Sequence, residues 1–177
     1  KIDTEGEKMN DIFQILLLLI LILINAFFAM SEIAIITLNE NKIKKMARNG
    51  HKGAEKILNT TKNSSNFLAT IQVGVTLSGF LTSASASTIF ASKVAEFFSF
   101  LPLSQSILEG FSTVLITIIL SYFSLVLGEL VPKKIAMQNA EKISFKVIGI
   151  ISAIEKIFSP FIKFLSASTN FIVKLFG

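Results

Sequence analysis

The chain has no cysteine and no tryptophan, and it contains a single histidine and a single tyrosine among its 177 residues. Without cysteine it forms no disulfide and no zinc–thiolate site, and it has no thiol nucleophile. The lone histidine, His51, lies in a basic segment between glycines, which indicates a solvated loop rather than a metal ligand. Because the sequence also shows neither a serine–histidine arrangement nor a phosphate-binding glycine loop, we expect no enzymatic activity.

Charge is sparse as well, at 16% of residues, whereas 51% are apolar and 17 residues are phenylalanine. With a mean hydropathy of +0.66, this composition is typical of an integral membrane protein rather than a soluble domain. The net charge is +5, and many of the lysines lie in one loop. This clustering indicates how the chain is oriented in a membrane rather than nucleic-acid binding. We therefore expect an all-α integral membrane protein with no nucleic-acid partner.

Three long apolar runs predict transmembrane helices over residues 12–38, 66–92 and 110–131. The first run contains the polar residues Gln14 and Asn25, and the second carries no charge. As one helix, the first run would be roughly 40 Å long, which exceeds the hydrocarbon core of about 30 Å. It therefore either tilts and projects from the membrane or breaks near Ser31.

The polar segment 39–65 between the first two spans is strongly basic. Its lysines and arginine are Lys42, Lys44, Lys45, Arg48, Lys52, Lys56 and Lys62. The positive-inside rule places this loop in the cytoplasm, the segment 1–11 outside the cell and the C-terminus inside, at the plasma membrane. Apolar residues at helical spacing on either side of Asn49–Gly50 predict two short amphipathic helices along the anionic inner leaflet.

Residues 139–177 mix apolar stretches with lysines, and Ser159–Pro160 interrupts them. A fourth span over 143–165 would bury Lys146, Glu155 and Lys156, so it is the weaker interpretation. We expect instead two amphipathic helices at the inner surface, separated at the proline and leading to cytoplasmic domains outside this chain. With the loop helices they would form a cytoplasmic-side belt beneath a three-span transmembrane domain, residues 12–138.

Small and hydroxyl residues distinguish the second span. One helical face carries Gln72, Thr76, Gly79, Ser83 and Ser87, and a second row beside it carries Ser78, Thr82 and Ala86. Small residues let helices approach closely in lipid, so a packing seam is one interpretation. The same face is suited to line an ion site, and the sequence leaves both interpretations open.

The third span ends in the motif GELVPK, and a carboxylate at membrane depth is a candidate functional group. Pro132 has no N–H, so the carbonyl of Gly128, four residues earlier, loses its helical partner beside Glu129. Oxygen donors of this kind suit hard cations such as Na⁺ and Mg²⁺. Broken helices with freed carbonyls are ion sites in transporters.

Ser31 and Glu32, at the end of the first span, supply a hydroxyl and a second carboxylate. In one interpretation these groups and Glu129 bind a cation together. In a second, Glu129 pairs with Lys133 at i, i+4 and Glu32 pairs with a loop lysine, which would be an interfacial charge clamp. In a third, Glu129 stays protonated and relays protons.

Three stretches together resemble the CorC/CNNM family, and more closely its hemolysin-C-like bacterial branch: residues 25–32 (NAFFAMSE), 70–79 (TIQVGVTLSG) and 128–133 (GELVPK). The resemblance covers nearly the whole chain, as the transmembrane (DUF21) domain of that family. It implies a homodimer with three transmembrane helices and a juxtamembrane helical belt. It also implies a cytoplasmic CBS-pair module that binds ATP, which lies outside this chain.

The resemblance further implies Mg²⁺ export coupled to Na⁺ entry through an inward-facing acidic cavity. The motif positions carried over are Ser31, Glu32, Gly128, Glu129, Pro132 and Lys133. Several relatives have Gly-Asn-Asn in the second helix, where this chain has Gly74-Val75-Thr76. Gln72, Thr76 or a carbonyl near Gly79 would substitute, which leaves cation selectivity open. The alternative function is a membrane anchor and dimerisation platform for a cytoplasmic nucleotide-sensing module, without transport.

Overall fold

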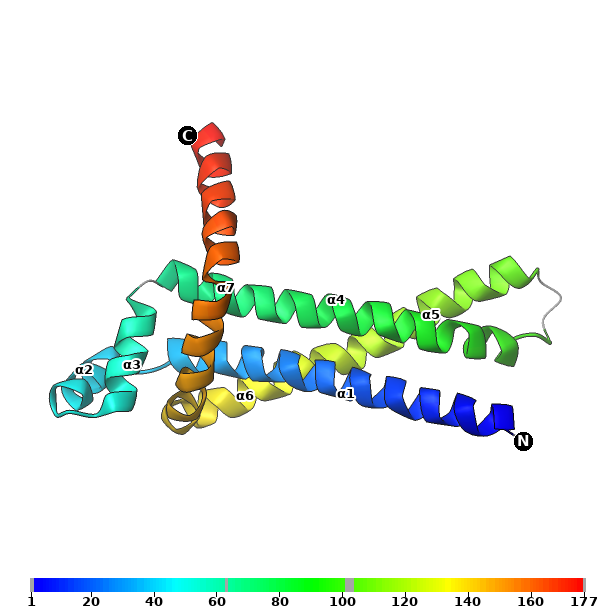
Figure 1. Ribbon diagram of the computed structural model, residues 1–177, viewed down its shortest axis with the longest axis horizontal. Coiled ribbons are helices and arrows are strands. Elements are labelled where there is room, and N and C mark those ends of the chain that lie inside the picture. The colour runs from blue at the N-terminus through cyan, green and yellow to red at the C-terminus, as the bar shows by residue number, and fades with distance from the viewer. Residues whose placement is uncertain (1, 63, 101–103, 177) are drawn as a thin grey trace. The chain divides into compact units, whose positions relative to one another are not determined.

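The computed structural model describes residues 2–62, 64–100 and 104–176, and every secondary-structure element in those ranges is a helix (Figure 1). In chain order they are α1 (Ile2–Ile36), α2 (Glu40–Arg48), α3 (Lys52–Thr61), α4 (Ser64–Phe97), α5 (Gln105–Leu125), the π-helix η1 (Val126–Leu130), α6 (Val131–Gln138) and α7 (Ala140–Phe176). The prediction of an all-α fold is therefore confirmed.

Among the residues that the structure describes, three stretches are long and apolar enough to cross a membrane: Ile12–Ile36, Ser64–Ser85 and Gln105–Gln138. Their number and order confirm the predicted three-span membrane fold. The first helix does not break near Ser31 but continues to Ile36. The hydroxyl of Ser31 donates to the carbonyl of Phe27 at 2.7 Å, a local bond that a continuous helix accommodates.

The chain divides into two compact units, which we describe separately. Unit 1 comprises Lys1–Ala26 and Thr76–Leu130, and unit 2 comprises Phe27–Val75 and Val131–Gly177. The boundary falls within α1, within α4 and between η1 and α6. Helices α1 and α4 therefore each contribute one part to each unit.

Unit 1 has a small buried core and a large apolar surface. Leu18 of α1 is 6% exposed and packs with Phe90 of α4 and Leu120 of α5. By contrast, Phe80 is 70% exposed and Ile118 is 63% exposed. Exposed apolar side chains in such number indicate a surface that faces lipid or another chain.

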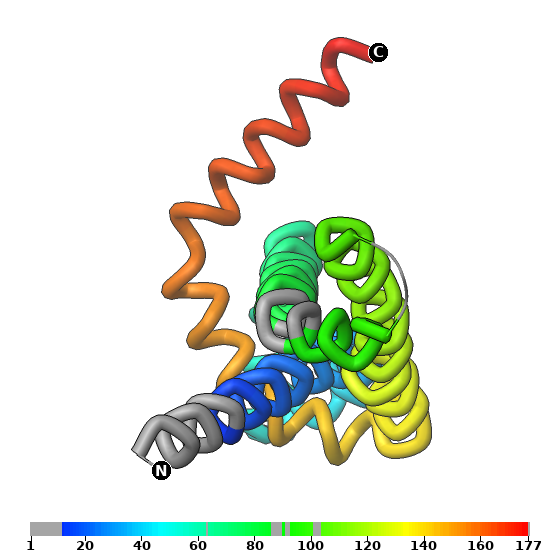
Figure 2. The backbone as a smooth tube through the Cα atoms, turned by 90° about the vertical axis from the view of Figure 1, so that its right-hand side faces the viewer, coloured from blue at the N-terminus to red at the C-terminus, as the bar shows by residue number. Residues whose placement is uncertain are grey.

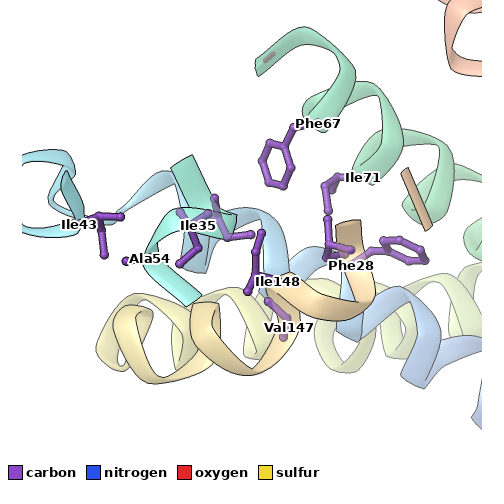
Figure 3. Close-up of a cluster of buried hydrophobic side chains, with 10 residues drawn as sticks. Phe28, Ile35, Ile43, Ala54, Phe67, Ile71, Val147 and Ile148 are labelled. Atoms are coloured by element: carbon purple, nitrogen blue, oxygen red, sulfur yellow. The ribbon is translucent and has the colours of Figure 1, made fainter. Parts of the chain in front are cut away.

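Unit 2 contains the main hydrophobic core, which joins five helices (Figure 3). Its buried members are Phe28 and Ile35 from α1, Ile43 from α2, Ala54 and Ile57 from α3, Phe67 and Ile71 from α4, and Val147, Ile148 and Ile151 from α7. Burial of this apolar surface stabilises short helices that would be marginal alone in water. The predicted pair of loop helices is thus confirmed, with α2 and α3 fixed by core contacts.

The turn between α2 and α3 explains the lone histidine. Gly50 has a φ of 83°, a conformation that a residue with a side chain rarely adopts. Directly after it, His51 Nδ1 accepts a hydrogen bond from the amide of Ala54 at 3.2 Å and caps α3. The imidazole also lies against the ring of Phe145, with centroids 4.7 Å apart. His51 therefore has a structural role in unit 2.

The predicted division of residues 139–177 at Ser159–Pro160 is wrong, because α7 runs as one helix from Ala140 to Phe176 (Figure 2). Pro160 removes a single amide donor, and its own exposed position leaves water free to solvate the local backbone. Buried side chains occur on both sides of it, at Ile151 and at Ile162. Core packing before the proline and local packing after it favour an uninterrupted helix.

Candidate functional site

The candidate site is built around η1, the π-helical segment that precedes Pro132. In a π-helix each carbonyl bonds the amide five residues later, so one extra residue is accommodated per turn. The helical axis therefore continues from α5 through η1 into α6. The expected break at the proline is therefore not a gap between helices: the turn before Pro132 is π-helical, and α6 begins directly after it.

Gly128 lies where η1 approaches α1 closely within unit 1. A Cβ atom at this position would lie 3.0 Å from Asn25 Nδ2 and 3.5 Å from the carbonyl oxygen of Ile22. A side chain at this position would therefore require the Asn25 side chain to move. Glu129, the next residue, is half-buried and lies in the same candidate span.

Asn25 is a component of this region that the sequence motifs did not assign to the site. It is 5% exposed, and its Oδ1 accepts a hydrogen bond from Ser78 Oγ at 3.1 Å. Its other amide atom lies against Gly128. Asn25 thus connects α1, α4 and η1, and the available signal was a polar residue inside an otherwise apolar run.

Of the two small-residue rows on α4, one packs within unit 1. Ser78 and Thr82 are each 3% exposed, and Thr82 Oγ1 donates to the carbonyl of Ser78 at 2.7 Å. In the other row, a Cβ atom on Gly79 would meet no described atom within 4 Å. Thr76 and Gly79 are both half-buried. The side chains of Ala86 and Ser87 lie outside the described residues.

In unit 2, the α1 part of the candidate site consists of Ser31 and Glu32. Ser31 is fully buried, and its hydroxyl proton is used by the bond to Phe27, so its oxygen is left as an acceptor. Glu32 lies 3.5 Å from Lys133 Nζ, and both side chains are about a quarter exposed, at 26% and 28%. The expected pairing of Glu32 with a loop lysine is therefore wrong.

The loop lysines make other ion pairs. Lys42 pairs with Glu141 at the start of α7, and Lys44 pairs with Glu40 one turn earlier on α2. The first pair joins two helices of unit 2, whereas the second is local. Both are exposed, so each contributes about 0–1 kcal/mol.

The α4 part of the site in unit 2 consists of Gln72 and Gly74. Gln72 is exposed, and Gly74 is half-buried. A Cβ atom on Gly74 would lie 2.5 Å from the ring of Phe28. Glycine at this position is thus required for packing of α4 against α1, and only its backbone is available as a ligand.

Each unit therefore brings together a different subset of the predicted site. Unit 1 contains Thr76, Gly79, Gly128 and Glu129, and unit 2 contains Ser31, Glu32, Gln72, Gly74, Pro132 and Lys133. In the described ranges, no group of three or more His, Asp or Glu side chains is arranged to bind a metal ion. Any cation would depend on hydroxyl and backbone oxygens and on retained water, as hydrated Mg²⁺ does.

Comparison with known proteins gives the family. The model of the cyclin M transmembrane N-terminal domain (CNNM) matches residues 16–177. The chain belongs to this family. The match covers the second and third candidate spans, most of the first, η1 and α7, so the family assignment and the membrane fold agree.

Bacterial relatives support this assignment. The chain is 32% identical over 164 residues to UPF0053 protein sll0260 of Synechocystis, covering 93% of this chain and 37% of that protein. It is 30% identical over 158 residues to UPF0053 protein YrkA of Bacillus subtilis, covering 89% of this chain and 36% of that protein. The chain thus spans little more than a third of either relative.

Proposed function

We propose that this CNNM domain is the membrane domain of a divalent-cation transporter that exports Mg²⁺ in exchange for Na⁺ entry. The proposal rests chiefly on η1, which lies inside an apolar candidate span and contains both Gly128 and Glu129. A carboxylate in such a span is costly and is therefore a functional-site candidate. π-Helical segments within α-helices frequently mark functional sites.

The proposed cation ligands are oxygen atoms. The residues that would supply these oxygen atoms are the ones that the sequence predicted: Ser31, Glu32, Gln72, Gly74, Thr76, Gly79, Gly128 and Glu129. Carboxylates would supply the charge, and hydroxyl and backbone oxygens would complete the shell together with water. Thr76 offers a neutral hydroxyl where relatives offer an amide, so we propose that this chain binds Mg²⁺ with more of its hydration water retained.

Lys133 has a separate role in the proposal. Its ammonium group neutralises Glu32, which would otherwise be a half-buried charge without compensation. A cation that binds Glu32 would replace this positive charge. Lys133 would then act as an internal counter-ion that preserves the acidic site while no cation is bound.

The proposed setting is a homodimer in the plasma membrane. We place the N-terminus outside and the C-terminus in the cytoplasm, in accordance with the basic residues of α2 and α3. The exposed apolar residues of unit 1 are available for contact with lipid or with a second chain. The greater length of the relatives is consistent with further domains, and we propose CBS-type modules that bind ATP.

A flux assay with matched serine variants tests the proposal. Ser31 and Ser144 are both fully buried, and each donates to the carbonyl four residues earlier at 2.7 Å. In liposomes loaded with a Mg²⁺ indicator, Ser31→Ala should abolish flux, whereas Ser144→Ala should retain it. If Ser31→Ala and the unmodified chain transport Mg²⁺ at the same rate, the ligand assignment is wrong.

A membrane anchor without transport is the second candidate, and the Glu32–Lys133 pair favours it because that acid already has a cationic partner. Calorimetry with Mg²⁺, Mn²⁺ and Na⁺ separates the two functions. A transporter should show saturable heat that is lost in Glu129→Gln. An anchor should show no cation-dependent heat and no cation-dependent rise in thermal stability.

A further inference from the structure

A polar cavity lies between α3 and α7 in unit 2, apart from every residue of the proposed cation site. Its volume is about 370 Å³, within the range of roughly 300–1,000 Å³ that small-ligand sites occupy. All of its lining residues are polar: Lys56, Asn59 and Thr60 from α3, and Ser152, Glu155, Lys156 and Ser159 from α7. Polar residues gathered on two facing helices indicate a hydrated binding site rather than a packing defect.

The spacing of these residues shows that each helix presents one polar face. On α3 the lining residues recur at i, i+3 and i+4, and on α7 they recur at i, i+3, i+4 and i+7. Beside them, the buried residues Ile57 and Ile151 belong to the core that joins the same helices. The core fixes the distance between α3 and α7 and thereby preforms the cavity.

The hydroxyl groups of the cavity are available to a ligand. Elsewhere on α7, Ser144 and Ser168 donate to the carbonyl four residues earlier. Within the described part of the chain, neither Ser152 nor Ser159 makes a side-chain hydrogen bond. Thr60, which is only 7% exposed, likewise makes none there, although its neighbour on α3 does. The Thr60 hydroxyl is therefore left to water or to a ligand.

The charges of the cavity favour an anion. Two lysines face one carboxylate, which leaves an excess of positive charge. Among the residues that the structure describes, Glu155 forms no ion pair with Lys56 or Lys156. Both ammonium groups are therefore available, and lysine is a common ligand of phosphate oxygens.

We propose that this cavity binds a phosphate group, with Lys56 and Lys156 supplying charge and Thr60, Ser152 and Ser159 donating hydrogen bonds. Exposed apolar side chains follow directly on α7, with Ile157 74% exposed and Phe158 40% exposed. They would contact acyl chains if the phosphate belongs to a phospholipid. The shared chemistry is the phosphate, and the experiment separates a lipid headgroup from free phosphate.

The test uses the whole purified chain in neutral detergent. Phosphatidic acid and diacylglycerol with identical acyl chains differ only in the phosphate, and their retention is measured by native mass spectrometry. Inorganic phosphate is added in a separate thermal-shift measurement. The site variant is Lys56→Gln/Lys156→Gln, and its control is Lys52→Gln/Lys163→Gln, which changes the same net charge on the same helices outside the cavity lining.

We expect the chain to retain phosphatidic acid in preference to diacylglycerol. The site variant should bind phosphatidic acid at least about tenfold more weakly than the unmodified chain, because it lacks the charge-assisted hydrogen bonds of the two lysines. The control should change less than about threefold, since removing diffuse charge is a weak effect. Ser152→Ala, which keeps the charge, should weaken retention as well. A thermal shift with inorganic phosphate that the site variant loses would identify free phosphate as the source.

Two outcomes would overturn the proposal. In the first, neither phosphatidic acid nor inorganic phosphate binds more than the phosphate-free lipid. In the second, the site and control variants lose binding equally and Ser152→Ala has no effect, which shows diffuse attraction only. Because both lysines are exposed, all variants should keep the unmodified circular dichroism spectrum. Retention of lipid does not depend on cation transport, so this test and the flux test fail separately.

Discussion

Lys133 Nζ of α6 lies 3.5 Å from a carboxylate oxygen of Glu32 on α1, so the lysine of one sequence motif neutralises the acid of another. Both side chains are about a quarter exposed, which places the pair between a surface ion pair and a buried one. The contact joins the end of α1 to the start of α6 within unit 2. It also explains how an acid near the end of a membrane span is tolerated.

Removing one partner of this pair should destabilise unit 2. We expect Glu32→Gln or Lys133→Gln alone to cost about 1 kcal/mol, and the double variant to cost less than the sum of the single variants. The measurement is a double-mutant cycle of thermal unfolding in detergent. Strict additivity of the two substitutions would contradict the pairing.

Gly128→Ala should reduce Mg²⁺ flux strongly, because the added Cβ would lie 3.0 Å from Asn25 Nδ2 and displace the side chain that connects α1, α4 and η1. Gly110→Ala is the matched control, since a Cβ atom there would meet nothing within 4 Å in the described part of the same span. The flux of both variants is measured in liposomes at equal protein content. Equal flux in the two variants would contradict a role for this close approach.

Gly74→Ala should destabilise the chain by about 1–3 kcal/mol, the usual cost of overpacking. The new methyl group would lie 2.5 Å from the ring of Phe28, so the ring must move. Phe28→Leu in the same chain should restore part of the stability. Gly79→Ala, on the same helix with open space at its Cβ among the described residues, should leave the unfolding temperature nearly unchanged. Thermal unfolding followed by circular dichroism measures all four chains.

Glu155 should make stability depend on pH. Burial raises the pKa of Glu155 above its ordinary value of 4.5, because desolvation disfavours the charged carboxylate. The folded state therefore binds the proton more tightly than the unfolded state, and the resulting stabilisation is present below pH 4.5 and is lost as pH rises through the higher folded pKa. Glu155→Gln should remove this contribution. Unfolding temperatures compared between pH 4 and pH 7 should show a smaller change for the variant than for the unmodified chain.

The features that sequence predicted are those with local signals. The three spans follow from uninterrupted hydropathy, and α2 and α3 follow from the apolar spacing on either side of Asn49–Gly50. Their bounds shifted by a few residues, since the end of a helix depends on capping and packing. The family resemblance drawn from the motifs around Gly128 and Ser31 is likewise confirmed by the family match.

The features that sequence missed depend on contacts between helices. No local sequence pattern predicts that Lys133 lies close to Glu32, or that Asn25 lies against Gly128. Local rules predicted a break at Pro132 and did not predict the π-helical segment η1 that precedes it. Helix α7 passes through Pro160 because buried residues on both sides outweigh one lost amide donor.

The central claim is that Glu129 binds the transported cation, and Mg²⁺ flux in Glu129→Gln liposomes tests it most directly. Glu109→Gln is the matched control, because Glu109 lies in the same candidate span on an exposed surface. We predict that Glu129→Gln abolishes Mg²⁺ flux while Glu109→Gln retains it, with both proteins folded. Unchanged Mg²⁺ flux in Glu129→Gln would contradict the claim.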